Sequence, residues 1–502
     1  MGNRNPTKPN IICFVTDQQR ADHLGCYGNV EIKTPNIDRL AREGVTFTQS
    51  FVANPVCMPN RASMFTGRYP KAHRVRENGI ALSPADRVLP EVLRRAGYQT
   101  ASFGKIHLTP FAIVRGEETL DYECYESFQY WQDHDDLPTP YYGLEQVYLV
   151  DGHGPYVYGH YKHWLQRKHP GTYEKLHRDR ALVPPTGTRE SWKAAIPEEL
   201  HYNTIIADKT IEFLKTRDES RRFFVWCSFP DPHHPYSPPR PWCDFYDPRT
   251  IRFSPARREA ELDDLPPYFR DCYEGKIVTG GLEGDLRKTT DDHYREIAAH
   301  TYGMISMVDH NIGKVMGALE ELSLLDTTIV VFFSDHGDLM GDHWLINKGP
   351  FLYRGLVRVP TIWRLPDEPR AGTASPALIS AVDFAPTLFD LADVPIPDGV
   401  QGRSYGSVLN GQRETLRDCV YIEYDETCLK DRLRQIRSNE WAITYYANNG
   451  YGLLFDLRED PNELDNLWND KGYEKVKHEL LAGLLRQTSV ADDWLPPKKC
   501  HA

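Results

Sequence analysis

The stretch that decides the fold reads NIICFVTDQ over residues 10–18. Its five consecutive apolar residues indicate a strand that is covered on both faces, as strands of parallel sheets are. Residues 328–338, TIVVFFSDHGD, repeat the pattern of an apolar run that ends in polar and acidic residues. Helix-like and strand-like segments alternate between these runs, which predicts an α/β fold with a large, mostly parallel sheet sandwiched by helices. The first of these segments are helices at 34–43 and 89–96 and strands at 45–51 and 100–103.

The rest of the chain divides into an insertion, the second half of this core and a smaller C-terminal unit. Residues 111–200 are rich in Tyr, His, Trp, Pro and Asp and lack periodicity, as is typical of a long insertion that carries specificity. After a Gly-rich stretch at 398–404, short strands and a final helix predict a small α+β domain with an antiparallel sheet. We therefore expect one domain at 1–400 and a second at 401–502. The segments that support this division are a helix at 205–215, a strand at 222–228, a long helix around 297–319, strands at 420–423, 441–446 and 452–456, and a helix at 473–487.

Composition narrows the class of protein. The 502 residues include 59 Lys and Arg against 71 Asp and Glu, a net charge of −12, so there is no basic surplus for binding nucleic acid. No apolar run approaches the roughly 18 residues of a membrane helix, and we expect no membrane association. The polar start MGNRNPTKPN leaves no room for a secretory signal, which favours the cytoplasm. Ten cysteines without CxxC pairs indicate neither a disulfide scaffold nor a zinc ribbon.

Polar residues follow several of the predicted strands, where open α/β sheets collect their ligands. Asp17 and Gln18 end the first strand, and Asp335 and His336 end the strand at 328–333. Two carboxylates, an imidazole and an amide oxygen would make most of the ligand set of a divalent cation. For any single aspartate, the alternative is the N-cap of a helix.

The sequence CMPNR at 57–61, followed by ASMFTGR at 62–68, has the Cys-x-Pro-x-Arg core of the sulfatase family. The chain resembles that family, within the alkaline phosphatase superfamily, over essentially its whole length. The resemblance begins with KPNI at 8–11 and TPNIDRL at 34–40 and reaches LFDL at 454–457. It implies an alkaline phosphatase-like fold. It also implies that Cys57 is oxidised after translation to formylglycine (3-oxoalanine), which requires a formylglycine-generating or anaerobic sulfatase-maturating enzyme as a partner.

The resemblance assigns roles to individual residues. Asp17, Asp335 and His336 would hold one divalent metal together with position 57, and Gln18 would lie beside them. Arg61 would steady the formylglycine hydrate. The remaining implied contacts with nucleophile, sulfate and leaving group are Lys105 and His107 of the GKIH element, His233 of PHHPY at 232–236, and Lys348 of NKG at 347–349. Asn78 matches an active-site asparagine of the related phosphonate monoester hydrolases.

The chemistry of sulfate esters agrees with these roles. A sulfate monoester is an anion, and a metal ion with Lys105 and Lys348 would supply the positive field that its transition state requires. His233 or Lys348 could protonate the leaving group. One hydroxyl of an aldehyde hydrate can attack sulfur, and the other can then expel sulfate with His107 as the base.

Two departures from the common family pattern bear on metal and substrate. Many sulfatases have Asp-Asp and Asp-Asn where this chain has Asp17-Gln18 and Asp335-His336. The metal shell therefore loses a negative charge and gains a nitrogen, which admits Mn²⁺ beside Ca²⁺. Phosphonate monoester hydrolases and choline-sulfatase-like enzymes share these features, whereas the Lys105-x-His107 element points to true sulfatases.

The sequence therefore predicts hydrolysis of an aryl, carbohydrate or small-alcohol sulfate monoester. Two alternatives stay open: a phosphonate monoester hydrolase or phosphodiesterase with the same nucleophile, and a catalytically silent protein that keeps the Cys57 thiol and holds an anion. Formation of a homo-oligomer is open as well. Two further groups have alternative interpretations. The histidines of the insertion and the aromatic residues between them could line a substrate pocket or lie on the surface; they are His153, His160, His163, Tyr156, Tyr158, Tyr161 and Trp164. Arg354 and Arg358 could meet a substrate anion, or Arg358 could form a structural ion pair.

Overall fold

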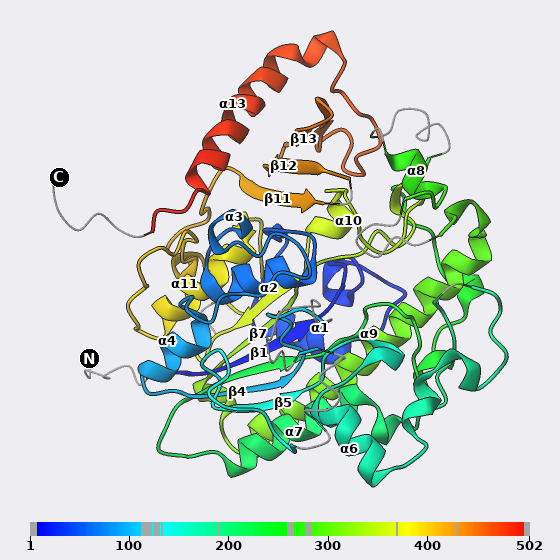
Figure 1. The fold of residues 1–502 in the computed structure, drawn as a ribbon. Coiled ribbons are helices and arrows are strands. Elements are labelled where there is room, and N and C mark those ends of the chain that lie inside the picture. The colour runs from blue at the N-terminus through cyan, green and yellow to red at the C-terminus, as the bar shows by residue number, and fades with distance from the viewer. Residues whose placement is uncertain are drawn as a thin grey trace.

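A large mixed sheet forms the centre of the molecule (Figure 1). The computed structural model describes residues 8–111, 123–124, 131, 134–188, 190–258, 266, 268–277, 284–367, 370–427 and 429–495. The sheet has eight strands in the order β5-β4-β6-β1-β7-β8-β2-β9. Their bounds, in that order, are Gln146–Leu149, Gln99–Gly104, Phe223–Ser228, Asn10–Thr16, Thr328–Ser334, Thr361–Arg364, Val45–Phe47 and Thr373–Ser375.

The first apolar run of the sequence forms β1, which lies in the middle of this sheet. It pairs in parallel with β6 on one side and with β7 on the other, and every residue of β1 and β7 is buried. β8 runs antiparallel to both of its neighbours, and the other pairings of this sheet are parallel. The predicted large, mostly parallel sheet is therefore confirmed.

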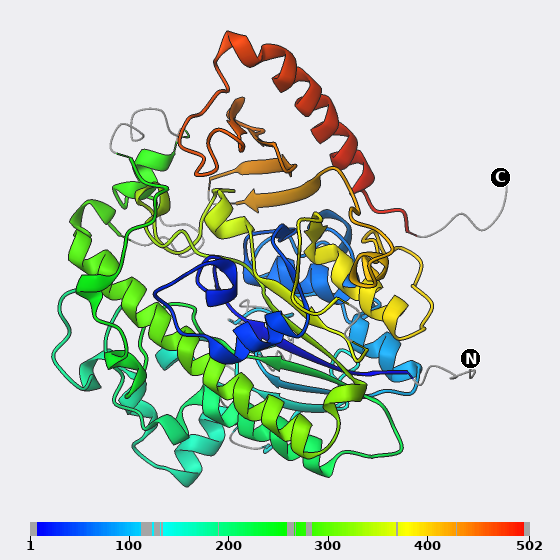
Figure 2. The ribbon, with the colours of Figure 1, turned by 180° about the vertical axis from the view of Figure 1, so that it is seen from behind.

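Helices cover both faces of the sheet, and two hydrophobic cores result. Alternate residues of β1 serve the two cores: Ile12 and Phe14 face one, and Ile11, Cys13 and Val15 face the other. The first core contains residues of α1 (Pro35–Arg42), α7 (Tyr202–Thr216) and the long α9 (Asp291–Glu321), which crosses the face seen in Figure 2. The second contains residues of α2 (Cys57–Thr66), α4 (Leu89–Arg95) and α11 (Phe384–Leu391).

Shorter helices occupy the connections. They are α3 (Pro70–His73), α6 (His160–Lys168), α8 (Phe269–Tyr273), α10 (Arg354–Val357) and α12 (Gly406–Leu409). In the part of the chain that the structure describes, no helix has both the length and the apolar character needed to cross a bilayer.

The C-terminal sheet is antiparallel, as predicted, but has one strand more than the sequence indicated. Its order is β11-β12-β13-β14, and α13 (Glu474–Val490) packs along it (Figure 1). The strand that the sequence did not reveal is β12, DRLRQIR, whose charges hide its strand character. Arg437 of β12 is fully buried and pairs with Glu463, which offsets part of the cost of burying its charge. The four strands are Val420–Glu426, Asp431–Arg437, Trp441–Tyr446 and Tyr451–Asp456.

Two other segments differ from expectation. The strand predicted at 45–51 is broken into β2 and β3 (Ser50–Phe51), and β3 pairs with β10 (Ile379–Ser380) in a separate two-stranded sheet. The break falls at Thr48, whose carbonyl accepts from Arg358 Nε. The insertion at 111–200 contains β5, the edge strand of the main sheet, and α6, so part of it belongs to the core layer.

Candidate active site

Cys57 is the first residue of α2 and lies at the carboxyl-end edge of the main sheet. Its side chain is buried, with Sγ 3.1 Å from His336 Nε2, 3.3 Å from Lys348 Nζ and 3.7 Å from Asp17 Oδ1. The residue before it is extended, and Pro59 falls in the first helical turn, where its missing N–H breaks no helical bond. The nucleophile candidate therefore stands at the positive end of a helix dipole.

The thiol of Cys57 is acidified by its surroundings. Burial and the Asp17 carboxylate act to raise its pKa, but the nearby cations, led by Lys348, outweigh them and place the pKa below its ordinary value. Lowered thiol pKa values mark reactive rather than inert cysteines.

Four of the predicted metal ligands come together. Donor atoms of Asp17, Cys57, Asp335 and His336, all buried, lie within 4.8 Å of one another. His336 Nε2 is 3.4 Å from Asp17 Oδ1 and 3.8 Å from Asp335 Oδ1. The other ring nitrogen of His336 is 2.8 Å from the Gly337 carbonyl, which holds Nε2 toward the carboxylates. Two carboxylates, an imidazole and the side chain at position 57 are a donor set that fits one divalent cation.

Arg61 ties the nucleophile helix to these carboxylates. Its Nε donates to Asp335 Oδ2 at 2.7 Å, and Nη2 lies 3.5 Å from Asp17 Oδ2. Nη1 donates to the Lys105 carbonyl and to Ser228 Oγ, each at 3.1 Å. Burial acts to lower the pKa of Arg61, and the two carboxylates raise it above its ordinary value. Arg61 is thus a fixed, fully buried cation one turn beyond Cys57.

Lys105 pairs with Asp17 on the other side of the cluster. Its Nζ contacts Asp17 Oδ2 and lies 2.6 Å from His153 Nε2. Burial acts to raise the pKa of Asp17, yet the Lys105 ammonium holds it well below its ordinary value. Burial acts in the opposite sense on Lys105, and Asp17 keeps its pKa above the ordinary value. Both groups are therefore charged at neutral pH.

Lys348 lies between Cys57, Gln18 and His233. Its Nζ is 2.8 Å from His233 Nε2 and 3.3 Å from Gln18 Oε1. Burial, and then the neighbouring His153 and Lys348, lower the pKa of His233 well below its ordinary value. A neutral His233 can accept a hydrogen bond from the Lys348 ammonium through Nε2.

The structure brings His107 and Asn78 near the site without joining them to Cys57. His107 is buried and stacks on Phe111 with ring centroids 3.6 Å apart, and its Nδ1 has no hydrogen-bond partner among the described residues. Its pKa is held well below the ordinary value by burial and then by Lys105. Asn78 is exposed, and its Oδ1 accepts from the backbone N–H of Met58 at 3.1 Å, directly beside the nucleophile.

Two further residues complete the site: His153, one of the histidines that the sequence left as possible pocket residues, and Asp338, to which the sequence gave no role. His153 comes from the insertion and stacks on His233 with ring centroids 3.5 Å apart. Its pKa falls to about 3, first through burial and then through Lys105. Asp338 accepts from Gln18 Nε2 at 2.6 Å and from the Tyr236 hydroxyl at 2.9 Å. The signal for Asp338 was its place two residues after His336 in SDHGD, whereas nothing local in the sequence distinguishes His153 from its neighbours.

Comparisons with known proteins agree with this geometry. A family model described as sulfatase matches residues 9–394, and one described as N-sulphoglucosamine sulphohydrolase, C-terminal, matches residues 341–489. An arylsulfatase of Clostridium perfringens is 31% identical over 93% of this chain and 92% of its own. A choline-sulfatase of Rhizobium meliloti is 28% identical over 92% of this chain and 82% of its own.

A solved structure is also similar over nearly the whole chain. The phosphonate monoester hydrolase of Agrobacterium radiobacter superposes with a TM-score of 0.82 at 28% identity and covers 97% of each chain. The alkaline phosphatase-like fold implied by the sequence is thereby confirmed. The chain belongs to the sulfatase family, hydrolases that act on sulfuric esters.

Proposed function

We propose that this protein hydrolyses a sulfate monoester with a formylglycine made from Cys57 as its nucleophile. The observation that carries the proposal is the placement of Cys57 Sγ within 3.3 Å of both His336 Nε2 and Lys348 Nζ, at the start of α2. Oxidation of Cys57 by a formylglycine-generating or anaerobic sulfatase-maturating enzyme would supply an aldehyde hydrate at this position, whose second hydroxyl allows sulfate to be released.

The two buried lysines support binding and activation of an anionic ester. Lys105 and Lys348 place ammonium groups next to Asp17 and next to Cys57. Preorganised cations in a site without bulk water stabilise charge that develops in the transition state, here on the sulfate oxygens and the leaving oxygen. Lys348, hydrogen-bonded to His233, is placed to donate a proton to the leaving group.

We propose that Asp17, Asp335, His336 and the side chain at position 57 hold one divalent metal, Ca²⁺ or Mn²⁺. When bound, the ion would neutralise sulfate charge and favour ionisation of the nucleophile. Gln18 donates its backbone N–H to Asp335 Oδ1 at 3.1 Å, and its side-chain oxygen accepts from Lys348 Nζ at the same edge. Arg61 keeps Asp17 and Asp335 in place through its own hydrogen bonds.

The remaining roles follow from position. His107, neutral and next to Lys105, would act as the base that regenerates the aldehyde, and Asn78 would contact the substrate beside the start of α2. The substrate would be an aryl, carbohydrate or small-alcohol sulfate whose organic part meets the insertion, because that segment supplies His153 to the site. We place the catalytic domain at 1–400 and the C-terminal domain at 401–502.

A phosphonate monoester hydrolase is the second candidate. Gln18, Asn78 and His336 match that branch, and a phosphonate monoester hydrolase is similar to this chain over 97% of its length. The Lys105-x-His107 element favours sulfate, because phosphonate monoester hydrolases typically lack it and the chain carries both residues.

The Cys57 peptide tests the proposed nucleophile directly. Conversion to formylglycine makes this peptide about 18 Da lighter in a mass spectrum. We expect turnover of an aryl sulfate to scale with the converted fraction and to vanish in Cys57→Ala. Turnover by a preparation in which Cys57 is wholly unconverted would overturn the proposal.

A further inference from the structure

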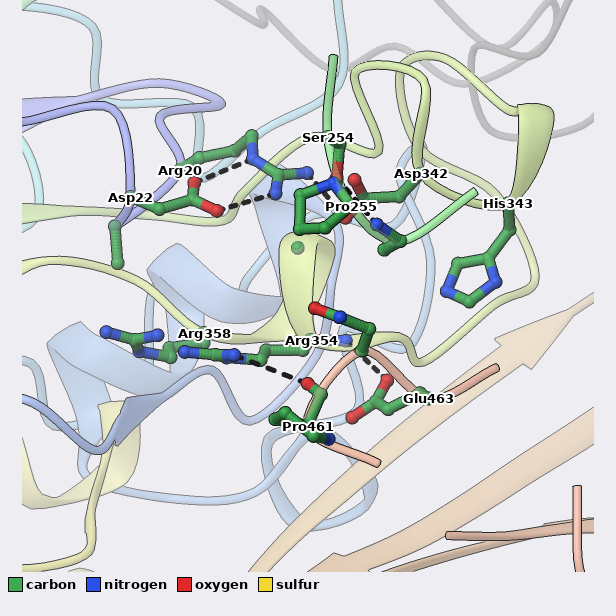
Figure 3. Close-up of a pocket in the computed structure, with 14 residues that line it drawn as sticks. Arg20, Asp22, Ser254, Pro255, Asp342, His343, Arg354, Arg358, Pro461 and Glu463 are labelled. Atoms are coloured by element: carbon green, nitrogen blue, oxygen red, sulfur yellow. Dashed lines mark hydrogen bonds and ion pairs between the residues drawn. The ribbon is translucent and has the colours of Figure 1, made fainter. Parts of the chain in front are cut away.

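Two arginines that the catalytic site does not use lie together at a separate cavity. Arg354 begins the short helix α10 and Arg358 follows its end, and the two side chains extend in the same direction (Figure 3). The cavity measures about 120 Å³ and lies between α10, residues 254–256 and residues 461–463. It is lined by none of Asp17, Cys57, Lys105, His233 or Lys348, so it is distinct from the catalytic cluster.

Among the described residues, the hydrogen bonds of both guanidinium groups go to backbone carbonyls. Arg354 Nη1 donates to the Pro461 carbonyl at 3.3 Å, and Arg358 Nε donates to the Thr48 carbonyl at 2.9 Å. Within the ranges that the structure describes, no carboxylate forms an ion pair with either residue. The structural ion pair considered for Arg358 is therefore not formed there, and most N–H donors of both groups stay available.

The acids that face this cavity already have other partners. Asp22 accepts from Arg20 Nε at 2.8 Å and from Nη2 at 2.7 Å, and Asp342 accepts from Arg20 Nη1 at 2.7 Å. Glu463 pairs with Arg437 and accepts the backbone N–H of Arg354 at 2.8 Å. Arg354 and Arg358 thus remain as two adjacent cations whose hydrogen bonds in the described residues go to carbonyl oxygens, and the attraction of Asp22 reaches Arg358 without an ion pair.

This arrangement is electrostatically unfavourable without an anion. Burial lowers the pKa of Arg358 to about 10, and the next contribution is repulsion from Arg354. The Asp22 carboxylate and Tyr27, whose ring lies 5.8 Å from the Arg358 guanidinium, act in the opposite sense, but the pKa stays lowered. Guanidinium groups bind sulfate and phosphate oxygens through pairs of parallel hydrogen bonds. No side chain of the described residues accepts such a pair from Arg354 or Arg358.

We propose that Arg354 and Arg358 form a second oxyanion site that takes a sulfate or phosphate group apart from the catalytic centre. The cavity has room for one tetrahedral oxyanion, since a single water molecule needs only about 15 Å³. The group can come from two sources, free inorganic sulfate or a second sulfate on a multiply sulfated substrate. The site does not depend on which ester the catalytic centre cleaves.

Binding of radiolabelled inorganic sulfate, at constant ionic strength and neutral pH, tests the site. Equilibrium dialysis of the full chain should show one more sulfate bound per chain than in the double variant Arg354→Gln/Arg358→Gln. Arg354→Gln alone should weaken this binding about tenfold, because one charge-assisted contact is lost. Arg249→Gln removes an arginine whose side chain is 89% exposed, and it should bind as the wild type does.

The single variant keeps the test decisive if the double variant does not fold, because Arg354 is exposed and its side chain contacts only a carbonyl. Equal sulfate binding by the wild type and Arg354→Gln, in number and affinity, would overturn the proposal.

Kinetics in sulfate-free buffer separate the two sources. If the occupant is a second substrate sulfate, Arg354→Gln raises KM for a disulfated ester and leaves KM for a monosulfated ester unchanged. If the occupant is free sulfate, dialysis shows the loss of binding, while both KM values match the wild type.

Discussion

The side-chain amide of Gln18 donates to Asp338 Oδ2 over 2.6 Å, and its carbonyl oxygen lies 3.3 Å from Lys348 Nζ. Since a carboxylate only accepts hydrogen bonds, Asp338 fixes the amide so that the oxygen of Gln18 faces the catalytic cluster. Asp338 is itself held by the Tyr236 hydroxyl at 2.9 Å. Asp338, to which the sequence analysis gave no role, thus orients Gln18, which the sequence placed beside the metal ligands.

Replacement of Asp338 should therefore weaken the proposed metal site without removing a ligand. We expect Asp338→Ala to reduce metal affinity about 10- to 100-fold, as changes behind metal ligands do. Asp338→Asn keeps an acceptor for Gln18 and should lose less. Calorimetric titration of the metal-free chain measures both, and unchanged affinity in Asp338→Ala would show that the Gln18 orientation does not matter.

Loss of the Lys105 ammonium should lower the catalytic rate, whereas loss of a surface lysine should not. Lys105→Met removes an ammonium that contacts Asp17, and we expect kcat/KM to fall about 100-fold or more. Lys215→Met on the exposed side of α7 is the matched control and should leave kcat/KM unchanged. Steady-state rates on an aryl sulfate decide the matter, and a change below twofold in Lys105→Met would contradict the assigned role.

Two arginine pairs of the C-terminal sheet should differ sharply in their contribution to stability. Arg437 and Glu463 are both buried, so Arg437→Ala leaves a buried carboxylate and should cost about 3–5 kcal/mol. Arg458 pairs with Asp456 at the surface, and Arg458→Ala should cost less than about 1 kcal/mol. Urea unfolding compares the two variants, and similar losses would refute this difference.

Acid should destabilise the protein through its buried neutral histidines, of which His73 is an example. Its Nδ1 accepts from Val75, its Nε2 is 3.0 Å from Ser63 Oγ, and burial lowers its pKa from 6.5 to about 3. Below pH 6.5 the unfolded chain protonates this histidine and the folded chain does not, so stability present above that pH is lost as pH falls toward about 3.

The loss attributable to His73 should reach up to about 3 kcal/mol at pH 4. In His73→Gln the free energy of unfolding should fall less steeply between pH 6.5 and 4 than in the wild type. The exposed His478 on α13 provides the control, His478→Gln, which should keep the wild-type slope. Identical slopes for all three proteins would contradict a neutral His73.

The part of the site that follows strand ends was predictable from sequence. Asp17, Lys105 and Asp335 come directly after β1, β4 and β7, and the carboxyl ends of parallel strands necessarily share one edge. The Cys-x-Pro-x-Arg motif then identified Cys57 as the nucleophile, and the family resemblance identified the residues around it. The large sheet was equally accessible, since its central strands are continuous apolar runs.

The unpredicted parts depend on contacts between distant segments. β12 has a polar sequence, and it can be buried because Arg437 forms an ion pair with Glu463. Glu463 follows β13 and β14 in the chain, so the sequence near β12 does not reveal this pair. His153 reaches the site only because the insertion folds back over it, where its ring stacks on His233. Local periodicity carries no information about such pairings, which tertiary packing alone determines.

The central claim is tested most directly by measuring kcat/KM for an aryl sulfate and an aryl phosphonate monoester side by side. The assay uses metal-loaded, formylglycine-containing protein, with Cys57→Ala as the blank. Lys105 and His107 predict a clear preference for the sulfate ester and no activity in the blank. Preference for the phosphonate would contradict the account and would show that Gln18, Asn78 and His336 determine the substrate instead.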